Sequence, residues 1–210
     1  MKVDAIVFEN GSDKSRKRLF AAFSPEQSKL LSAAMLEDVL TALKSSVVHE
    51  VVVVGTDSDV RGVVEKCGVS FVQIERAGLN LALKKAIASC MEKKSDAVLM
   101  LPVNIPLVSS SDIDRMVALG SQESSLVLCP SMKGGTNAVL LNPPDVVQAQ
   151  FGRGSFFKLV KAAIDKDVAL KFYSSRETAF DMDSEEDLGK LLEIKNNTAS
   201  KRIFEEIRPK

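Results

Sequence analysis

The segment Val51-Val52-Val53-Val54-Gly55 decides the fold. Its unbroken run of β-branched side chains predicts a strand that is buried on both faces, as in a parallel sheet with helices on each side. Other apolar runs in the chain predict further strands. They lie at residues 3–8, 70–74, 97–101, 125–129, 138–141 and 169–173.

Helical patterns lie between these strands. Ser24 followed by Pro25 and Gln27 predicts a helix start, with Ser24 as N-cap and Gln27 completing a capping box. Apolar residues then recur every four positions from Leu31 to Leu43, which predicts one buried helical face. Further helices are predicted at 79–93, 111–119, 155–165 and 184–194. This alternation of strands and helices predicts an α/β fold with a mostly parallel sheet.

Length and composition narrow the class of protein. The chain has 210 residues, which suits one domain over 1–195 followed by a charged helix or tail at 196–210. The tail has a thin apolar stripe that could dock on the domain or contact a partner, including a second copy in a homodimer. Lys plus Arg and Asp plus Glu both total 28, and this balance argues against a nucleic-acid binder. No stretch is apolar enough for a transmembrane helix.

The cysteines and the histidine exclude several kinds of site. Cys67, Cys90 and Cys129 are odd in number and have no paired spacing, so we expect reduced thiols in a cytoplasmic protein. His49 is the only histidine, which excludes a zinc site built from His and Cys. A Ser-His-Asp triad would have to use that same residue.

A cluster of cations follows the first strand. Lys14, Arg16, Lys17 and Arg18 lie within five residues, just before a helix. Charge-assisted donors of this kind bind phosphate, and Arg can do so in a bidentate manner. The alternative is a solvated basic loop. The segment does not match the phosphate-binding pattern GxxxxGK[ST] of P-loop enzymes.

Glycine-rich turns occur where ligands bind in α/β folds, beyond the carboxyl ends of the strands. Gly78 and Asn80 precede a helix, where they could approach a nucleotide or only cap the helix. Two more turns can present backbone N–H groups to an anion. These are Gly134-Gly135-Thr136-Asn137 and Gly152-Arg153-Gly154-Ser155.

Oxygen ligands for a metal follow two other strands. Asn104 lies between two prolines at a strand exit and could face a ligand or only form a turn. Asp181 and Asp183 are two residues apart, so in an extended segment they project to one side and can share Mg²⁺. We expect Ser184 and Asp187 to form a capping box for the next helix. Cations, anion-binding turns and a carboxylate pair together indicate phosphoryl or nucleotidyl transfer.

In combination, these segments resemble the 2-phospho-L-lactate guanylyltransferase family, which includes variants that use phosphoenolpyruvate. The resemblance implies a single-domain, three-layer α/β/α fold of the nucleotide-diphospho-sugar transferase type, which is Rossmann-like. It covers residues 3–192. The segments that carry it are Ser24-Pro25-Glu26, Met35-Leu36-Glu37-Asp38-Val39-Leu40, Gly78-Leu79-Asn80, Gly134-Gly135-Thr136-Asn137-Ala138, Phe151-Gly152-Arg153-Gly154-Ser155-Phe156 and Asp181-Met182-Asp183.

The resemblance also implies a reaction and its participants. A phosphate oxygen of a small phosphorylated carboxylic acid attacks the α-phosphorus of GTP, and pyrophosphate leaves, with Mg²⁺ as the cofactor, in coenzyme F-420 biosynthesis. The expected site residues are Arg16, Arg18 and Asn104 for catalysis, Thr136, Asn137, Gly152 and Ser155 for the acceptor, Lys14, Lys17, Gly78 and Asn80 for the nucleotide, and Asp181 and Asp183 for the metal.

Two departures from the family pattern keep other functions open. Asn104 stands where the family has an Asp that binds the metal, and Phe8-Glu9-Asn10 replaces a Pro-x-Lys segment that binds phosphate. One alternative is another nucleotidyltransferase of this fold with a different base or acceptor. The other is a binding or regulatory relative with weakened catalysis.

Overall fold

A computed structural model of the chain describes residues 1–8, 18–55, 61–73, 78–122 and 124–208. Its strands form one seven-stranded sheet in the order β3-β2-β1-β4-β6-β5-β7. All pairs are parallel except β4–β6 and β5–β6. The strands are β1 (Val3–Phe8), β2 (Glu50–Gly55), β3 (Ser70–Gln73), β4 (Ala97–Pro102), β5 (Ser125–Pro130), β6 (Thr136–Asn142) and β7 (Ala169–Phe172). The predicted mostly parallel sheet is therefore confirmed, and Ile74, the end of one predicted strand, lies outside the described residues.

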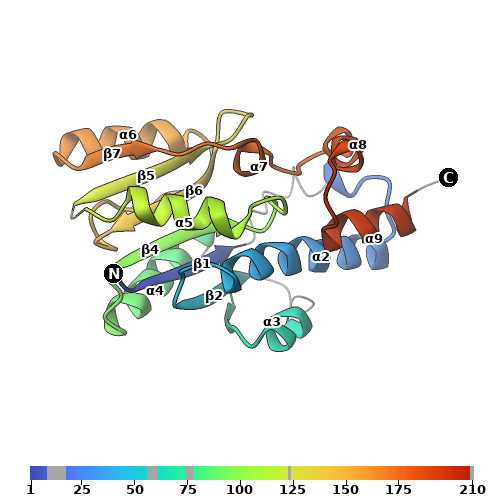
Figure 1. Cartoon of the computed structure of the whole chain (residues 1–210), viewed down its shortest axis with the longest axis horizontal. Coiled ribbons are helices and arrows are strands. Elements are labelled where there is room, and N and C mark those ends of the chain that lie inside the picture. The colour runs from blue at the N-terminus through green and yellow to red at the C-terminus, as the bar shows by residue number, and fades with distance from the viewer. Residues whose placement is uncertain (9–17, 56–60, 74–77, 123, 209–210) are drawn as a thin grey trace.

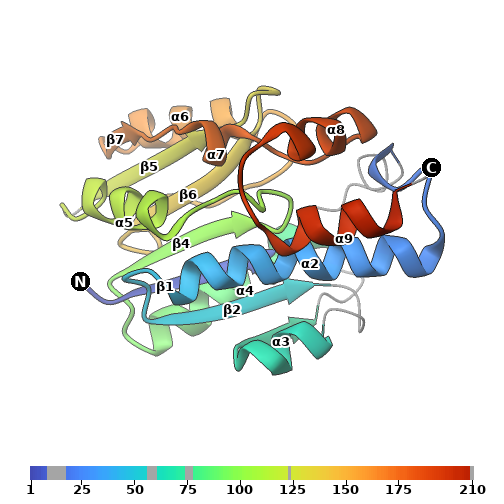
Figure 2. The ribbon, with the colours of Figure 1, turned by 45° about the vertical axis from the view of Figure 1, so that its right-hand side comes forward.

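Helices cover both faces of this sheet (Figures 1 and 2). One face packs against α2, α3 and α5, and the other against α4 and α6. The helices are α2 (Pro25–Lys44), α3 (Arg61–Cys67), α4 (Leu79–Glu92), α5 (Ser110–Leu119), α6 (Ser155–Asp165), α7 (Arg176–Ala179), α8 (Glu185–Glu193) and α9 (Ala199–Ile207). The expected three layers are present, and α3 and α7 are short helices that the sequence analysis did not predict.

Strand β1 shows why two separate cores form. Val3, Ala5 and Val7 belong to the core under α2 and α5, whereas Ile6 and Phe8 belong to the core under α4 and α6. Successive side chains of a strand point to opposite faces, so an all-apolar strand supplies both cores at once. Such a strand is stable only in the interior of a covered sheet, and β1 lies between β2 and β4.

The start of α2 follows the local sequence closely. The backbone N–H of Gln27 donates to Ser24 Oγ at 3.2 Å, and the Ser24 N–H donates to Gln27 Oε1 at 2.9 Å. These reciprocal bonds satisfy two donors that a helix N-terminus otherwise leaves unpaired. The predicted capping box is therefore confirmed.

Helix α9 lies along α2 at the end of the chain (Figure 2). The Asp38 carboxylate of α2 accepts the backbone N–H of Ala199 at 2.6 Å and that of Ser200 at 2.9 Å. The apolar stripe of α9, with Phe204 buried, packs in a third core that includes Leu31 of α2. The stripe considered for docking or for a homodimer therefore faces α2.

The bond between Asp38 and α9 gives a first prediction. Asp38→Ala removes an acceptor for two N–H groups at a helix start, so we expect the free energy of unfolding to fall by about 1–2 kcal/mol. For a chain of this length that lowers the melting temperature by roughly 2–8 °C in circular dichroism melts. Glu37→Ala is the control, because Glu37 forms an exposed pair with Lys66 at 3.3 Å. Equal melting temperatures for both variants would contradict the role of Asp38.

Two further sequence expectations concern the cysteines and the membrane. All three cysteines are free thiols. Burial raises the pKa of Cys90 and of Cys129 to about 11, so neither is a thiolate at neutral pH. Every helix in the described parts of the chain is too short or too polar to cross a bilayer.

Candidate active site

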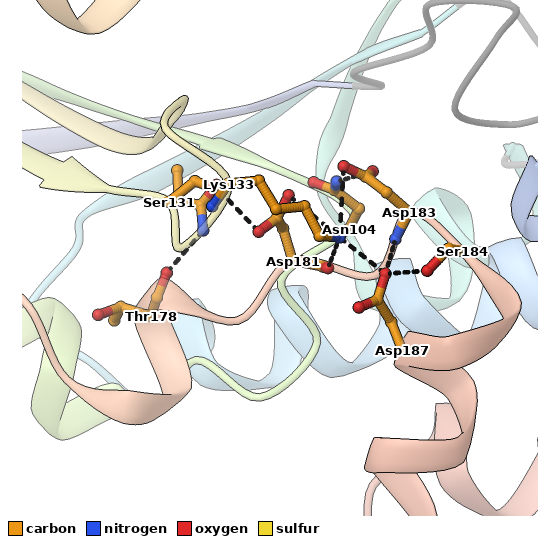
Figure 3. A network of polar contacts seen from close by, with 9 residues as sticks. Asn104, Ser131, Lys133, Thr178, Asp181, Asp183, Ser184 and Asp187 are labelled. Atoms are coloured by element: carbon orange, nitrogen blue, oxygen red, sulfur yellow. Dashed lines mark hydrogen bonds and ion pairs between the residues drawn. The ribbon is translucent and has the colours of Figure 1, made fainter.

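Three separate segments meet near the carboxyl end of β4. Asn104 follows β4, the loop 131–135 joins β5 to β6, and the segment 180–187 leads from α7 into α8. Figure 3 shows their polar side chains pointing toward one another. This is the edge of an α/β sheet at which ligands bind.

Asp181 and Asp183 are each held through their Oδ1 atoms. Ser131 Oγ donates to Asp181 Oδ1 at 2.8 Å, and Asn104 Nδ2 donates to Asp183 Oδ1 at 2.8 Å. The N–H of Met182, between the two acids, donates to the Asn104 carbonyl at 2.8 Å. The structure therefore brings together Asp181, Asp183 and Asn104, as the sequence analysis expected.

Lys133 lies among these acids, and the sequence analysis did not assign it to the site. Its Nζ donates to Asp187 Oδ2 and to the Asp181 carbonyl oxygen, both at 2.7 Å. The same Nζ lies 3.7 Å from Oδ2 of Asp181 and 3.7 Å from Oδ2 of Asp183. One ammonium group thus faces three carboxylates (Figure 3).

Asp187 has a different role from the one predicted. Its Oδ2 accepts Lys133 Nζ at 2.7 Å, Ser184 Oγ at 2.7 Å and the Asp183 N–H at 3.0 Å. The Ser184 hydroxyl therefore donates to Asp187 instead of capping the helix backbone, and the capping-box prediction was wrong. The cause is Lys133, whose charge draws the Asp187 carboxylate into the acidic cluster.

The pKa values of the acids reflect this crowding. Burial, together with the neighbouring Asp183, raises the pKa of Asp181 to about 6, although Ser131 and Lys133 oppose the rise. Burial also acts to raise the pKa of Asp187, but hydrogen bonds from Lys133, the Asp183 N–H and Ser184 bring it below its ordinary value. The negative charge of Asp181 is thus disfavoured by burial and by Asp183, and the Lys133 cation offsets only part of this effect.

The donor set fits a hard cation such as Mg²⁺. Within the described residues, Asn104 is nine-tenths buried and its Oδ1 has no hydrogen-bond partner. That oxygen and the Oδ2 atoms of Asp181 and Asp183 are oxygen ligands of the type that Mg²⁺ prefers. In the parts of the chain that the structure describes, no three carboxylate, imidazole or thiolate side chains are placed so that together they could hold a metal ion. Mg²⁺ is often held by only one or two carboxylates, with water and phosphate oxygens completing its shell.

A second group of predicted residues surrounds the start of α6. The hydroxyl of Ser155, the first residue of α6, donates to Thr136 Oγ1 at 3.2 Å, and both residues are buried. Gly152 and Gly154 have φ of +114° and +70°, which glycine adopts without strain. The turn 152–154 thus leads into a helix N-terminus, a favourable place for an anion.

Asn80 fixes this turn from α4. Its Nδ2 donates to the Phe151 carbonyl at 3.2 Å, and its Oδ1 accepts the Phe151 N–H at 2.9 Å. Gly78 is the N-cap of α4, with φ of +87°. The Asn137 amide donates to the Thr178 carbonyl at 2.9 Å, so it connects β6 to α7. Through the two bonds between Asn80 and Phe151, the turn at 78–80 is joined directly to the turn at 151–155.

These bonds predict the effect of Asn80→Ala. The change leaves both backbone groups of Phe151 without their partner, and we expect a loss of about 1–3 kcal/mol in unfolding free energy. Hydrogen–deuterium exchange should accelerate at the amides of 151–155. Asn80→Asp keeps the acceptor but loses the donor, so its exchange rates should be intermediate. Asn197→Ala, at an exposed position, serves as a control. Unchanged exchange at 151–155 in Asn80→Ala would rule out that the Asn80 side chain fixes this turn.

The basic loop is described only at its end. Arg18 is exposed and precedes Leu19, which is buried in the third core. Lys14, Arg16 and Lys17 lie outside the described residues, so their expected contacts with phosphate stay predictions.

Comparisons with known proteins show the family to which the chain belongs. Residues 3–209 match the family described as "Guanylyl transferase CofC like". A phosphoenolpyruvate guanylyltransferase of Rubrobacter xylanophilus is 32% identical over 91% of this chain and 94% of its own length. A 2-phospho-L-lactate guanylyltransferase of Methanothermobacter thermautotrophicus is 29% identical over 99% of this chain and 92% of its own.

Solved structures show the same fold. A nucleotide-diphospho-sugar transferase from Desulfovibrio desulfuricans G20 superimposes with a TM-score of 0.78 at 15% identity, over 98% of this chain and 95% of that one. A 4-diphosphocytidyl-2C-methyl-D-erythritol synthase from Anaerococcus prevotii has a TM-score of 0.63 at 12% identity, over 89% and 92% of the two chains. The expected nucleotide-diphospho-sugar transferase-like fold is therefore confirmed.

Proposed function

Because the chain belongs to the CofC-like guanylyl transferase family, we propose that it transfers GMP from GTP to the phosphate of a small phosphorylated carboxylic acid. The observation that carries this proposal is the family match over residues 3–209, which includes both the acidic cluster and the turns around α6. Phosphoenolpyruvate and 2-phospho-L-lactate are the acceptors to test, because the relatives carry these names. The guanylated product would enter coenzyme F-420 biosynthesis.

The bond changes in this reaction need little covalent help from the protein. A phosphate oxygen of the acceptor forms a bond to the α-phosphorus of GTP, while the bond from that phosphorus to the β-phosphate oxygen breaks and pyrophosphate leaves. The attacking oxygen is already anionic at neutral pH, so no side chain has to remove a proton. Catalysis therefore depends on positioning and on charge stabilisation.

Asp181 and Asp183 are the residues we propose to hold Mg²⁺, with the Asn104 amide oxygen beside them. When bound, the metal would neutralise charge on the triphosphate. Ser131 and Asn104 hold one oxygen of each carboxylate, which keeps the pair oriented before the substrates arrive. We assign the basic residues Lys14, Arg16, Lys17 and Arg18 to the triphosphate, since cations there would offset its charge.

The acceptor is assigned to the turn at α6. The backbone N–H groups of Arg153 and Gly154 and the hydroxyl of Thr136 can donate to its phosphate and carboxylate groups. Ser155, whose hydroxyl donates to Thr136 at 3.2 Å, would orient the Thr136 hydroxyl toward the acceptor. Asn80 acts on this site through its bonds to Phe151, and Gly78 leaves room for the nucleotide at the start of α4. We assign Asn137 to the same site as a residue that would hold β6 in place, because its amide bonds the Thr178 carbonyl of α7.

One observation favours a second function, that of a binding or regulatory relative with weakened catalysis. The Asn104 amide donates to Asp183, which an Asp at that position could not do unless it were protonated. The site thus carries one negative charge fewer than the family pattern.

Pyrophosphate release by the purified protein with Mg²⁺ tests both functions. Each of GTP, ATP, CTP and UTP would be combined with phosphoenolpyruvate and with 2-phospho-L-lactate, and the products identified by mass spectrometry. We expect release with GTP and one acceptor, and none without acceptor or with EDTA. A folded protein that binds GTP and releases no pyrophosphate would favour the binding relative. Release with another nucleotide would identify a different nucleotidyltransferase.

The cysteines support a proposal for the cell compartment. Three free thiols, two of them buried, suit a reducing environment. We therefore place the proposed reaction in the cytoplasm.

A further inference from the structure

The Lys133 ammonium occupies the position from which a cation would contact both metal-binding carboxylates. Its Nζ is equidistant, at 3.7 Å, from Oδ2 of Asp181 and Oδ2 of Asp183. These are the oxygens opposite the ones bonded to Ser131 and Asn104. The protein thus supplies hydrogen bonds to one side of each carboxylate and a positive charge to the other.

The Lys133 ammonium makes its hydrogen bonds to groups other than these two Oδ2 atoms. Its hydrogen bonds go to Asp187 Oδ2 and to the Asp181 carbonyl, each at 2.7 Å. Lys133 therefore acts on the Oδ2 atoms of Asp181 and Asp183 chiefly through its charge. Replacing it by an uncharged side chain would leave the bonds from Ser131 and Asn104 in place.

The Lys133 side chain can move without its backbone. Its N–H donates to Ser131 Oγ at 3.0 Å, and the turn is closed by a bond from the Gly134 N–H to the Ser131 carbonyl at 3.1 Å. The side chain itself is 41% exposed. A four-carbon stem with this exposure can swing toward solvent while the turn stays as it is.

From this geometry we propose that Lys133 is an internal counter-cation that competes with divalent metal for Asp181 and Asp183. In the free protein its charge balances part of the acidic cluster, so a metal ion must enter beside a positive charge or displace it. Like charges at such short range repel strongly where water is partly excluded. Lys133 thus lowers the affinity of the nucleotide-free protein for metal, and it is a positioning residue rather than a ligand.

Asn104 also affects the net charge of the acidic cluster. An Asp at that position would add a negative charge to the cluster, whereas Asn104 donates a hydrogen bond to Asp183. With three carboxylates and one ammonium, the free cluster remains negative enough to attract a divalent ion. The inference rests on the metal site of the proposed function, but it does not depend on turnover.

Mn²⁺ binding to the full chain without nucleotide tests the proposal. Free Mn²⁺ would be counted by electron paramagnetic resonance in titrations of the wild type, Lys133→Met, Lys133→Arg and Lys161→Met. Met keeps an unbranched stem that matches Lys133 up to Cε and removes the charged ammonium group, whereas Arg keeps the charge. Lys161→Met is the matched control, because Lys161 pairs with Asp165 at 2.5 Å on α6, at a separate surface.

We expect Lys133→Met to bind Mn²⁺ at least tenfold more tightly than the wild type. Lys133→Arg and Lys161→Met should stay within threefold of the wild type. A purely structural lysine predicts the opposite result, since its loss would loosen the cluster and weaken Mn²⁺ binding. Equal or weaker binding by Lys133→Met would therefore overturn the proposal.

A measurement on the wild type covers the case in which Lys133→Met does not fold. Reductive methylation followed by mass spectrometry reports how accessible each lysine is. Mn²⁺ should accelerate modification of Lys133 relative to Lys161, and no acceleration would refute the competition. Turnover is judged separately. If Lys133→Met binds Mn²⁺ more tightly but the protein shows no turnover, this inference holds and the proposed function is contradicted. If the protein shows turnover but both forms bind Mn²⁺ equally, the proposed function holds and this inference is contradicted.

Discussion

Asp183→Asn should reduce guanylyl transfer by roughly 10²–10³-fold or more, because a preorganised electrostatic group at a reacting centre contributes about that much. The substitution keeps the shape of the side chain and an oxygen that can accept from Asn104, so the fold should be preserved. What it removes is one full negative charge from the proposed metal site. Asp181→Asn should behave similarly, since an Asn there can still accept from Ser131.

The measurement is kcat/KM for pyrophosphate release with saturating Mg²⁺, alongside a thermal melt. Asp165→Asn is the control, because its carboxylate forms an exposed pair with Lys161 on α6. Full activity in both Asp181→Asn and Asp183→Asn would exclude the metal assignment. A large loss of activity at an unchanged melting temperature would support it.

Phe8→Ala should be the most destabilising single truncation near the site. Phe8 is fully buried at the end of β1, and its ring lies 4.3 Å from that of Phe151 between centroids. Truncating a buried Phe to Ala costs about 3–5 kcal/mol, through lost burial and the cavity left behind. We expect a fall in melting temperature of roughly 2–4 °C for each kcal/mol.

The same change should weaken acceptor binding. Phe151 directly precedes the turn at Gly152, so a cavity beneath it loosens the proposed acceptor site. Phe8→Leu keeps most of the volume and should raise the KM for the acceptor less than Phe8→Ala does. Phe157→Ala is the control, because Phe157 is 74% exposed and its loss should change stability little. A Phe8→Ala protein as stable as this control would show that the packing on Phe151 contributes little.

Local signals predicted the elements of the fold well. The capping box at Ser24 and the valine run at 51–54 are recognisable within a few residues, because helix starts and buried strands depend on neighbouring side chains. The direction of β6 could not be predicted in the same way. A short apolar run has the same composition whether it pairs parallel or antiparallel, and only the short connection from Pro130 to Thr136 favours a hairpin.

The site was only partly predictable for a related reason. Asp181 and Asp183 were recognised because their spacing alone places them together. Lys133 and Asp187 were missed, since they are 54 positions apart and their bond exists only after folding. A lysine in a glycine-rich loop resembles any solvated surface lysine, and an acid at position 187 resembles a helix cap. Tertiary contacts, rather than residue type, decided both roles.

The hairpin between β5 and β6 has a consequence for how this protein can change by mutation. Because β6 runs antiparallel to β5, one short connection provides Ser131 to Asp181 and Lys133 to Asp187, and Thr136 at the start of β6 contacts Ser155. An insertion or deletion there would alter the cation site and the acceptor site together. Divergence toward a new acceptor through this loop is therefore constrained by the need to keep the cation site. Changes confined to 151–155 are free of that constraint, so we expect acceptor preference to diversify there first.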